Sequence, residues 1–220
     1  MATIGHVFSC AMTGYAFARY SFRGKGLLFG FVILSMIVPV QTIIIPSYIL
    51  YSNWGWINSK LYLPLLVPTF FGFGLSGGFF IFLFRQFFLG LPYEMEEAAR
   101  VDGCGPIRTY WRIMLPMSQS SLLVCSVLSL VWHWNDFFEP GVYITDVWLK
   151  MLPNRLPSLY AELNKEQHTM IQSNDIEGIM FNEAMLMAAT FLCIVPILIL
   201  YLILQRRFME GVERSGLTGM

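Results

Sequence analysis

Charged residues are scarce in this chain. Asp, Glu, Lys and Arg make up 13% of its 220 residues, about half the share that an ordinary soluble domain carries. Fourteen basic and fourteen acidic residues cancel to a formal net charge of zero, so no basic excess predicts a nucleic-acid partner. The abundance of Phe, Leu and Ile excludes intrinsic disorder. With 56% hydrophobic residues and a mean hydropathy of +0.59, the composition favours a membrane protein.

The residue patterns of metal sites, disulfide frameworks and nucleophilic enzymes are also missing. The four cysteines contain no CxxC pair and lie far apart, at Cys10, Cys104, Cys125 and Cys193, so their spacing predicts no disulfide framework. His6, His133 and His168 share no ligand spacing with a cysteine or carboxylate cluster, and we expect no metal site. The sequence contains no segment with a Ser/His/Asp arrangement, the pattern that would indicate a membrane-embedded enzyme with a nucleophile.

Charge is excluded from five long windows, residues 1–18, 26–59, 61–84, 113–135 and 184–205. A helix needs about 20 apolar residues to cross the hydrocarbon core, so each window predicts one span. In the long second window we expect the helix over Leu27–Leu50 and an interfacial segment over Tyr51–Ser59. The first window is not typical of a signal peptide, because no basic residue precedes Arg19. The fold class predicted for residues 1–220 is a single all-α polytopic membrane helix bundle with five spans.

The basic residues predict the orientation of these spans. If the Arg19–Lys25 turn is cytoplasmic, ten of the fourteen Lys and Arg residues lie inside and four lie outside. This excess satisfies the positive-inside rule, which counts Lys and Arg rather than net charge. With this orientation, the outer membrane boundary or the region beyond it contains the tryptophans at positions 54, 56, 132, 134 and 148. Aromatic residues of this kind are enriched at membrane–water interfaces. We therefore expect an external N-terminus and a cytoplasmic C-terminus.

One predicted cytoplasmic segment, about residues 91–116, is polar and carries helix start and stop signals. Pro92 suits the first position of a helix, and the glutamates that follow it suit the positive end of the helix dipole. Glu96 and Arg100 have the favourable i, i+4 spacing of an ion pair. Asp102-Gly103 predicts the end of this short helix, since glycine accepts the left-handed conformation of a C-terminal cap.

A second, amphipathic helix is predicted to restart at Gly105-Pro106 and to end at Leu115-Pro116. Its apolar stripe has the spacing i, i+3, i+4, i+7 and consists of Ile107, Tyr110, Trp111 and Met114. A short helix, a turn and an amphipathic helix suit insertion into a groove of a soluble partner. The helical pattern alone favours the alternative, an interfacial loop that covers the ends of the spans, because amphipathic loop helices are common.

A sequence motif in this segment favours docking into a partner over a plain interfacial loop. Glu97-Ala98-Ala99, three residues, Gly103, nine residues, Ile113, one residue and Leu115-Pro116 fill all seven fixed positions of E-A-A-x3-G-x9-I-x-L-P. This pattern resembles the cytoplasmic loop of bacterial ABC importer permeases, and Asp102 before the glycine is also similar to that family. The resemblance implies that these residues form the coupling helix that docks into a cleft of a separate ATPase.

Other segments resemble the maltose-type carbohydrate permeases within the same family. They are Gly14–Lys25, Ile37–Pro39 with Ile45-Pro46, Trp134–Phe137, and the C-terminal Leu204–Gly211 with Leu217–Gly219. The resemblance implies a bacterial cell-membrane complex of two permeases, a heterodimer in our expectation, with two cytoplasmic ATPases and an external solute-binding protein. Family members usually have one more span before the point where this chain begins. Five spans instead of six suggests a truncated or mis-started gene product, or a fragment.

Nucleotide chemistry is expected on a partner subunit. The sequence contains no G-x-x-x-x-G-K-[ST] phosphate loop, so we expect no cofactor on this chain and ATP-Mg on the ATPase. Closure of the ATPase dimer would then draw the cytoplasmic ends of the spans together and alternate access to a central cavity. The chain is therefore expected to be a transport subunit, not an enzyme.

The sequence predicts the residues of the solute path less clearly than it predicts the coupling segment. A sugar needs hydrogen-bonding groups and flat aromatic faces, and the candidate residues within or near the spans are Gln41, Thr42, Ser126, Ser129, Trp134 and Asn135. For any single one of these residues, the favoured interpretation is helix–helix hydrogen bonding or a place in an interfacial belt. The polar segment at about 139–183 is expected to be an external loop, either a receiving surface for the binding protein or a simple solvated loop.

These observations predict an ATP-driven import permease for a sugar or oligosaccharide. The alternatives are an import permease for another solute, such as a phosphodiester or a peptide, and a membrane-embedded enzyme, which would need a catalytic cluster that the sequence lacks.

Overall fold

The computed structural model describes residues 1–74, 76–159, 161 and 176–217, the last segment with side chains at 184–205. Within these residues the structure is helical and contains no strand. A further helical segment covers residues 152–159. The labelled helices are α1 (Ala2–Arg19), α2 (Lys25–Ile37), α3 (Val40–Asn53), α4 (Leu63–Phe70), α5 (Gly77–Leu89), α6 (Glu94–Val101), α7 (Pro106–Thr109), the π-helical turn η1 (Tyr110–Met114), α8 (Leu115–Met117), α9 (Gln119–Asn135), α10 (Phe138–Tyr143) and α12 (Ile176–Leu217).

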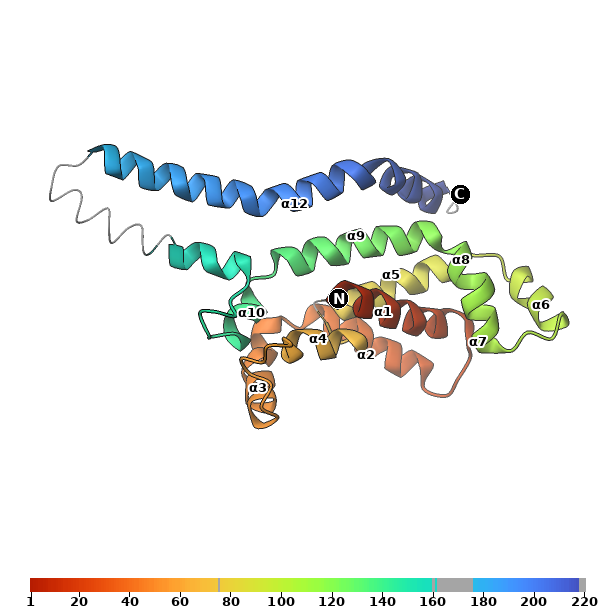
Figure 1. The fold of residues 1–220 in the computed structure, drawn as a ribbon. Coiled ribbons are helices and arrows are strands. Elements are labelled where there is room, and N and C mark those ends of the chain that lie inside the picture. The colour runs from red at the N-terminus through yellow and green to blue at the C-terminus, as the bar shows by residue number, and fades with distance from the viewer. Residues whose placement is uncertain (75, 160, 162–175, 218–220) are drawn as a thin grey trace.

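Helix α1 lies at the centre of the bundle and contacts α4, α5 and α9. Helix α2 packs on α5, and α12 packs on α9 (Figure 1). The main core is apolar and aromatic, and its fully buried side chains include Cys10, Phe80, Phe84, Phe88, Met114 and Cys125. The crossing of α1 over α5 depends on Gly14, because a Cβ atom there would lie 2.6 Å from the Phe84 Cβ.

Three breaks divide the predicted spans. Helices α2 and α3 meet at an angle of 102°, because Pro39 forces the residue before it out of the helical region and Val38 is extended. A turn at Phe71 and Gly72, where Gly72 has a φ of +74°, ends α4 ahead of α5. The segment Pro106–Met117 meets α9 at 79°, at Ser118, whose hydroxyl donates to the Leu115 carbonyl at 2.9 Å.

The structure therefore does not confirm five spans. Among the described residues, only Ala184–Gln205 within α12 is by itself long and apolar enough to cross a membrane, and the total rises to three if each bent pair is one span. The single helix predicted over Leu27–Leu50 is wrong because Pro39 bends it, and the 61–84 window holds two helices rather than one. A charge-free window records where charge is excluded and does not record where the backbone turns.

The two ends of the bundle carry different segments (Figure 1). The α1–α2 connection, the segment α6 to α8 and the C-terminal end of α12 gather at one end. Helices α3 and α10 lie towards the other end, where they contact each other. Of the predicted external loop, residues 160 and 162–175 lie outside the described residues. The segments that the charge distribution assigns to one side of a membrane thus share one end of the molecule.

Candidate functional site: a coupling segment and a central cavity

The short helix predicted after Pro92 is present as α6, and it is closed by the predicted glycine. Gly103 has a φ of +77°, in the left-handed region that glycine adopts without steric cost. The Cys104 N–H donates to the Ala99 carbonyl at 2.8 Å and the Gly103 N–H donates to the Arg100 carbonyl at 3.0 Å. This pair of bonds is the Schellman motif, so the glycine of the seven-position pattern has a defined backbone role.

Helix α6 has one buried face and one exposed face. Glu96 and Ala99 are each 2% exposed, whereas Glu97 and Ala98 are exposed. Val101 at the end of the helix is 88% exposed. Glu97, Ala98 and Gly103 of the predicted docking pattern are therefore accessible to another protein, and Ala99 packs inside the chain.

The second half of the pattern joins this segment to the bundle. Ile113 and Leu115 pack against the main core, and Pro116 is exposed. The predicted apolar stripe is divided, because Tyr110 and Met114 are buried while Ile107 and Trp111 are exposed. The reason is a wider turn at this point, in which the Leu115 N–H bonds to the Tyr110 carbonyl five residues earlier, so the predicted α-helical spacing no longer describes one face.

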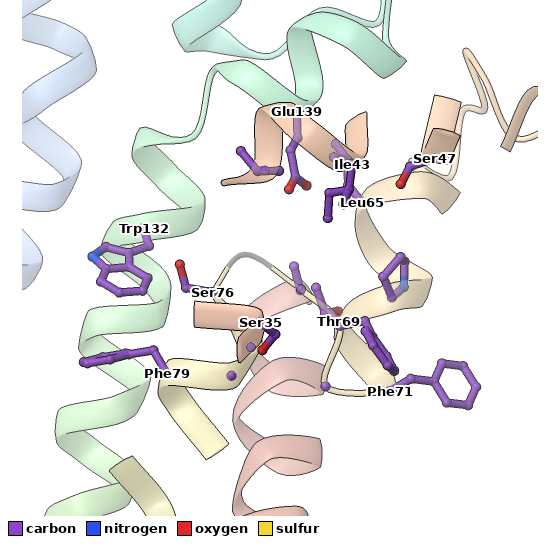
Figure 2. A pocket seen from close by; sticks show the side chains of 18 of the residues that line it. Ser35, Ile43, Ser47, Leu65, Thr69, Phe71, Ser76, Phe79, Trp132 and Glu139 are labelled. Atoms are coloured by element: carbon purple, nitrogen blue, oxygen red, sulfur yellow. The ribbon is translucent and has the colours of Figure 1, made fainter. Parts of the chain in front are cut away.

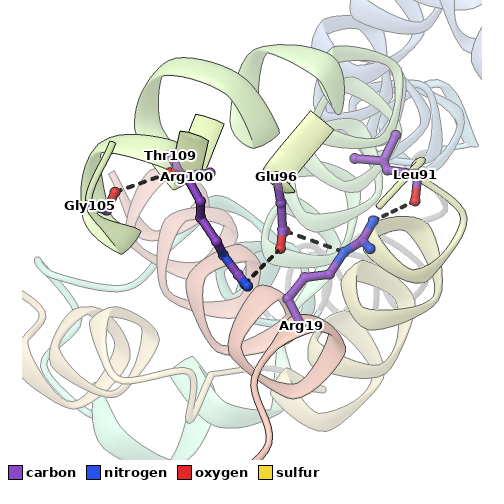
Figure 3. Close-up of polar contacts among 6 residues, drawn as sticks. All are labelled: Arg19, Leu91, Glu96, Arg100, Gly105 and Thr109. Atoms are coloured by element: carbon purple, nitrogen blue, oxygen red, sulfur yellow. Dashed lines mark hydrogen bonds and ion pairs between the residues drawn. The ribbon is translucent and has the colours of Figure 1, made fainter. Parts of the chain in front are cut away.

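An ion cluster, in which Glu96 and Arg19 are buried and Arg100 is exposed, attaches α6 to the end of α1 (Figure 3). The predicted Glu96–Arg100 pair is present, with 3.9 Å between Arg100 Nη2 and Glu96 Oε2. A nearer cation, missed from the sequence, is Arg19, whose Nε lies 3.5 Å from Glu96 Oε1. The Arg19 side chain is 6% exposed, and its Nη2 also donates to the Leu91 carbonyl. Local spacing could not reveal this contact, because 77 positions separate Arg19 from Glu96.

A cavity of about 1030 Å³ lies between α1, α2, α3, α4, α5, α9 and α10. Its polar lining includes hydroxyl groups and two carboxyl groups, and Trp132 and Phe79 add aromatic surface; the hydroxyl-bearing residues include Thr13, Ser35, Ser47, Thr69 and Ser76. Figure 2 shows the Glu139 carboxyl pointing into this space from α10. Among the described residues that line the cavity there is no Lys or Arg.

The two carboxyl groups of the cavity differ in their surroundings. Burial, followed by the nearby Asp136 carboxylate, raises the pKa of Glu139 to about 7. Burial also raises the pKa of Asp136. Asp136 Oδ1 accepts the N–H groups of Phe138 at 3.1 Å and Glu139 at 3.4 Å, which opposes that rise. Near neutral pH, Glu139 can therefore either donate or accept a hydrogen bond within the cavity.

The residues predicted for the solute path lie elsewhere. Gln41 and Thr42 are exposed on α3, and Ser126 is on α9, half-buried. Trp134 and Asn135 line a separate cavity of about 380 Å³ between α9 and α12, where the Trp134 indole N–H donates to the Cys193 carbonyl at 3.1 Å. None of these residues, nor Ser129, is part of the lining of the larger cavity, and their role in transport stays a prediction.

Ser129 belongs to a polar cluster with His6 and His133, and of these three residues only His133 lines the larger cavity. The Ser129 hydroxyl lies 3.2 Å from His6 Nδ1 and 3.3 Å from His133 Nδ1, and His133 Nδ1 also donates to the Ser129 carbonyl at 2.7 Å. His6 is fully buried. In the described part of the chain, no group of three or more His, Cys, Asp and Glu side chains could hold a metal ion.

Comparisons with known proteins identify the family of this chain. Residues 11–214 match the family of binding-protein-dependent transport system inner membrane components. The chain belongs to this family, and it is therefore a membrane-located permease of an ABC importer, not an enzyme. The family implies that it works with an ATPase and a binding protein.

Two named relatives and one solved structure show the range of similar proteins. The arabinooligosaccharides transport system permease protein AraQ of Halalkalibacterium halodurans is 30% identical, covering 95% of this chain and 67% of its own length. The sn-glycerol-3-phosphate transport system permease protein UgpE of Yersinia pestis is 28% identical, covering 97% and 68%. The chain thus spans about two thirds of the length of these relatives. A bacterial ABC transporter that imports the acidic polysaccharide alginate shares the fold, with a TM-score of 0.66 at 21% identity, covering 94% of this chain and 73% of that one.

Proposed function

We propose that this chain is the permease subunit of an ATP-driven importer that moves a neutral sugar or oligosaccharide by alternating access. The observation that carries the proposal is the E-A-A-x3-G-x9-I-x-L-P segment. It presents Glu97 and Ala98 to the outside, while Ile113 and Leu115 anchor it in the core. Such a segment is suited to receive force from another protein and to pass it into the bundle.

The end of the bundle that carries α6 is cytoplasmic in this proposal. It holds the α1–α2 connection and the C-terminal end of α12 (Figure 1), and ten of the fourteen basic residues belong to the segments assigned to that side. Two ATP-binding subunits would bind there and hold the ATP-Mg. A second, non-identical permease would complete the translocation path, and an external binding protein would deliver the solute at the other end.

The transported solute is inferred from the large cavity. Hydroxyl groups, carboxyl groups and aromatic surface are the partners that a sugar needs, and the walls contain all three kinds. Asp136 and Glu139 face no Lys or Arg among the described lining residues. A phosphate or carboxylate group on a solute would meet these carboxyl groups with His133 as the one basic side chain of the described lining and no Lys or Arg beside it, which is unfavourable at low dielectric.

The charges of the cavity lining make AraQ a better guide to the transported solute than UgpE. AraQ is named for arabinooligosaccharides, which are neutral, whereas UgpE is named for a phosphorylated solute. The cavity of this chain therefore supports a neutral, hydroxyl-rich solute over a phosphodiester.

Uptake by the complete transporter in liposomes tests the proposal. The vesicles would contain this chain, the second permease and both ATPases, with the binding protein outside and ATP-Mg inside. We expect ATP-dependent accumulation of labelled arabinotriose and no accumulation of labelled sn-glycerol-3-phosphate. ATP-dependent accumulation of sn-glycerol-3-phosphate alone would refute the neutral-solute assignment, and accumulation that is independent of ATP would refute the importer itself.

A further inference from the structure

Helix α6 cannot hold its position by its own stability. It has eight residues, and isolated helices shorter than about 12–15 residues are marginal in water. Its placement on the bundle therefore depends on its buried face and its flanks. That face contains the charged residue Glu96, which is 2% exposed. A buried carboxylate is costly unless it is paired, so its partner decides where α6 rests.

The partner from outside α6 is Arg19, the last residue of α1. Its guanidinium makes three contacts with α6 and the residues just before it, and Figure 3 shows two of them, those with Leu91 and Glu96. Nη2 donates to the Leu91 carbonyl, the Cζ atom lies 5.7 Å from the centre of the Tyr93 ring, and Nε lies 3.5 Å from Glu96 Oε1. A planar guanidinium can serve several such partners at once, which a lysine ammonium cannot do with the same geometry.

Helix α1 is well placed to pass on a movement. It contacts α4, α5 and α9, and its residues Ala2, Thr13 and Phe17 line the large cavity. The other ion pair of Glu96 is different, because its partner Arg100 belongs to α6 itself and is 56% exposed. Only the Arg19 pair, of these two, connects α6 to a helix that forms the cavity wall.

We propose that Arg19 and Glu96 are positioning residues that couple α6 to α1, so that movement of α6 against the ATPase shifts the cavity wall. The inference rests on the proposed function. The pair acts between two nearly buried side chains, where salt screens an ionic attraction far less than at the surface. Loss of the pair would leave α6 able to meet the ATPase while α1 no longer follows it.

The test measures ATP hydrolysis and arabinotriose uptake in the same liposomes, for the complete transporter. The variants are Arg19→Gln, Glu96→Gln and the double variant that carries both changes. Arg19→Gln leaves the buried Glu96 with only the exposed Arg100 as an ionic partner. Glu96→Gln leaves the buried Arg19 without a carboxylate, and the double change leaves two neutral amides. We expect the number of ATP molecules hydrolysed per solute to rise at least tenfold in each single variant, and the double variant to recover to within about threefold of the unaltered transporter.

The matched control is Arg23→Gln, which makes the same change four residues away at an exposed position on the same end of the bundle. It should keep the ratio of hydrolysis to uptake within twofold. A purely structural role would lower the amount of assembled transporter and leave this ratio unchanged. If Arg19→Gln does not assemble, Arg19→Lys keeps the charge but not the forked geometry, and we expect about a threefold rise in the ratio.

The outcomes separate this inference from the proposed function. Suppose that the unaltered transporter works and that the ratio of ATP hydrolysis to uptake is unchanged in Arg19→Gln and Glu96→Gln. This result overturns the coupling role and leaves the proposed function standing. An unchanged ratio in Arg19→Lys has the same meaning if the glutamine variant does not assemble. An unaltered transporter without ATP-dependent uptake overturns both.

Discussion

The contact between α1 and α5 makes a quantitative prediction at Gly14. In a Gly14→Ala variant the new Cβ atom would lie 2.6 Å from the Phe84 Cβ and 3.0 Å from both the Arg85 nitrogen and the Ile81 carbonyl oxygen. Ordinary contacts between such atoms are about 3.5–4.0 Å. Two of the three atoms belong to the backbone of α5, so a side-chain rotation cannot relieve the overlap, and the two helices must separate by roughly 1 Å.

Overpacking of this kind costs about 1–3 kcal/mol, and we expect Gly14→Ala to destabilise the folded chain by that amount. Gly26→Ala is the matched control, because Gly26 lies within α2 and a Cβ there has no neighbour within 4 Å. Alanine at an open helical position should stabilise by about 0.5–1 kcal/mol. Thermal unfolding of the purified permease in detergent measures both changes. Equal stability of the two variants would refute the close helix crossing.

Two further predictions concern Glu139 and Trp134. Burial raises the pKa of Glu139 from 4.5 to about 7, so the folded state holds a proton that the unfolded state has released, and stability falls as the pH rises between these values. Glu139→Gln should therefore gain up to about 3 kcal/mol over the unaltered chain at pH 8 and little at pH 5, measured by thermal unfolding; a gain that is independent of pH would contradict the burial argument. Trp134→Phe removes the bond to the Cys193 carbonyl and should cost about 1 kcal/mol of stability with an unchanged KM for arabinotriose; a raised KM would place Trp134 in the solute path instead.

The sequence could predict the features that depend on local chemistry. Exclusion of charge from residues 1–18 and 184–205 agrees with α1 and with the apolar part of α12. The glycine at 103 predicted the end of α6, because the left-handed cap is a property of one residue. The seven-position motif predicted the family, which the comparison over residues 11–214 confirms.

The sequence could not predict features that arise between distant segments. Pro39 was inside one expected span, yet proline is tolerated within membrane helices, so its presence did not settle whether the chain would bend by 102° there. The Arg19–Glu96 pair and the cavity both join residues from different helices. A single sequence contains no information on which buried carboxylate meets which cation until the helices are packed.

The central claim, that the segment 97–116 couples this permease to its ATPase, is tested most directly by comparing Gly103→Asp with Gly24→Asp. Both glycines have a positive φ, +77° and +81°, and a Cβ at either position meets nothing within 4 Å, so the backbone strain of the two changes is the same, about 1–2 kcal/mol. The measurement is ATP-dependent uptake of labelled arabinotriose, per permease assembled in the membrane. The account predicts that Gly103→Asp abolishes uptake while Gly24→Asp retains it. Equal uptake by the two variants would contradict the account.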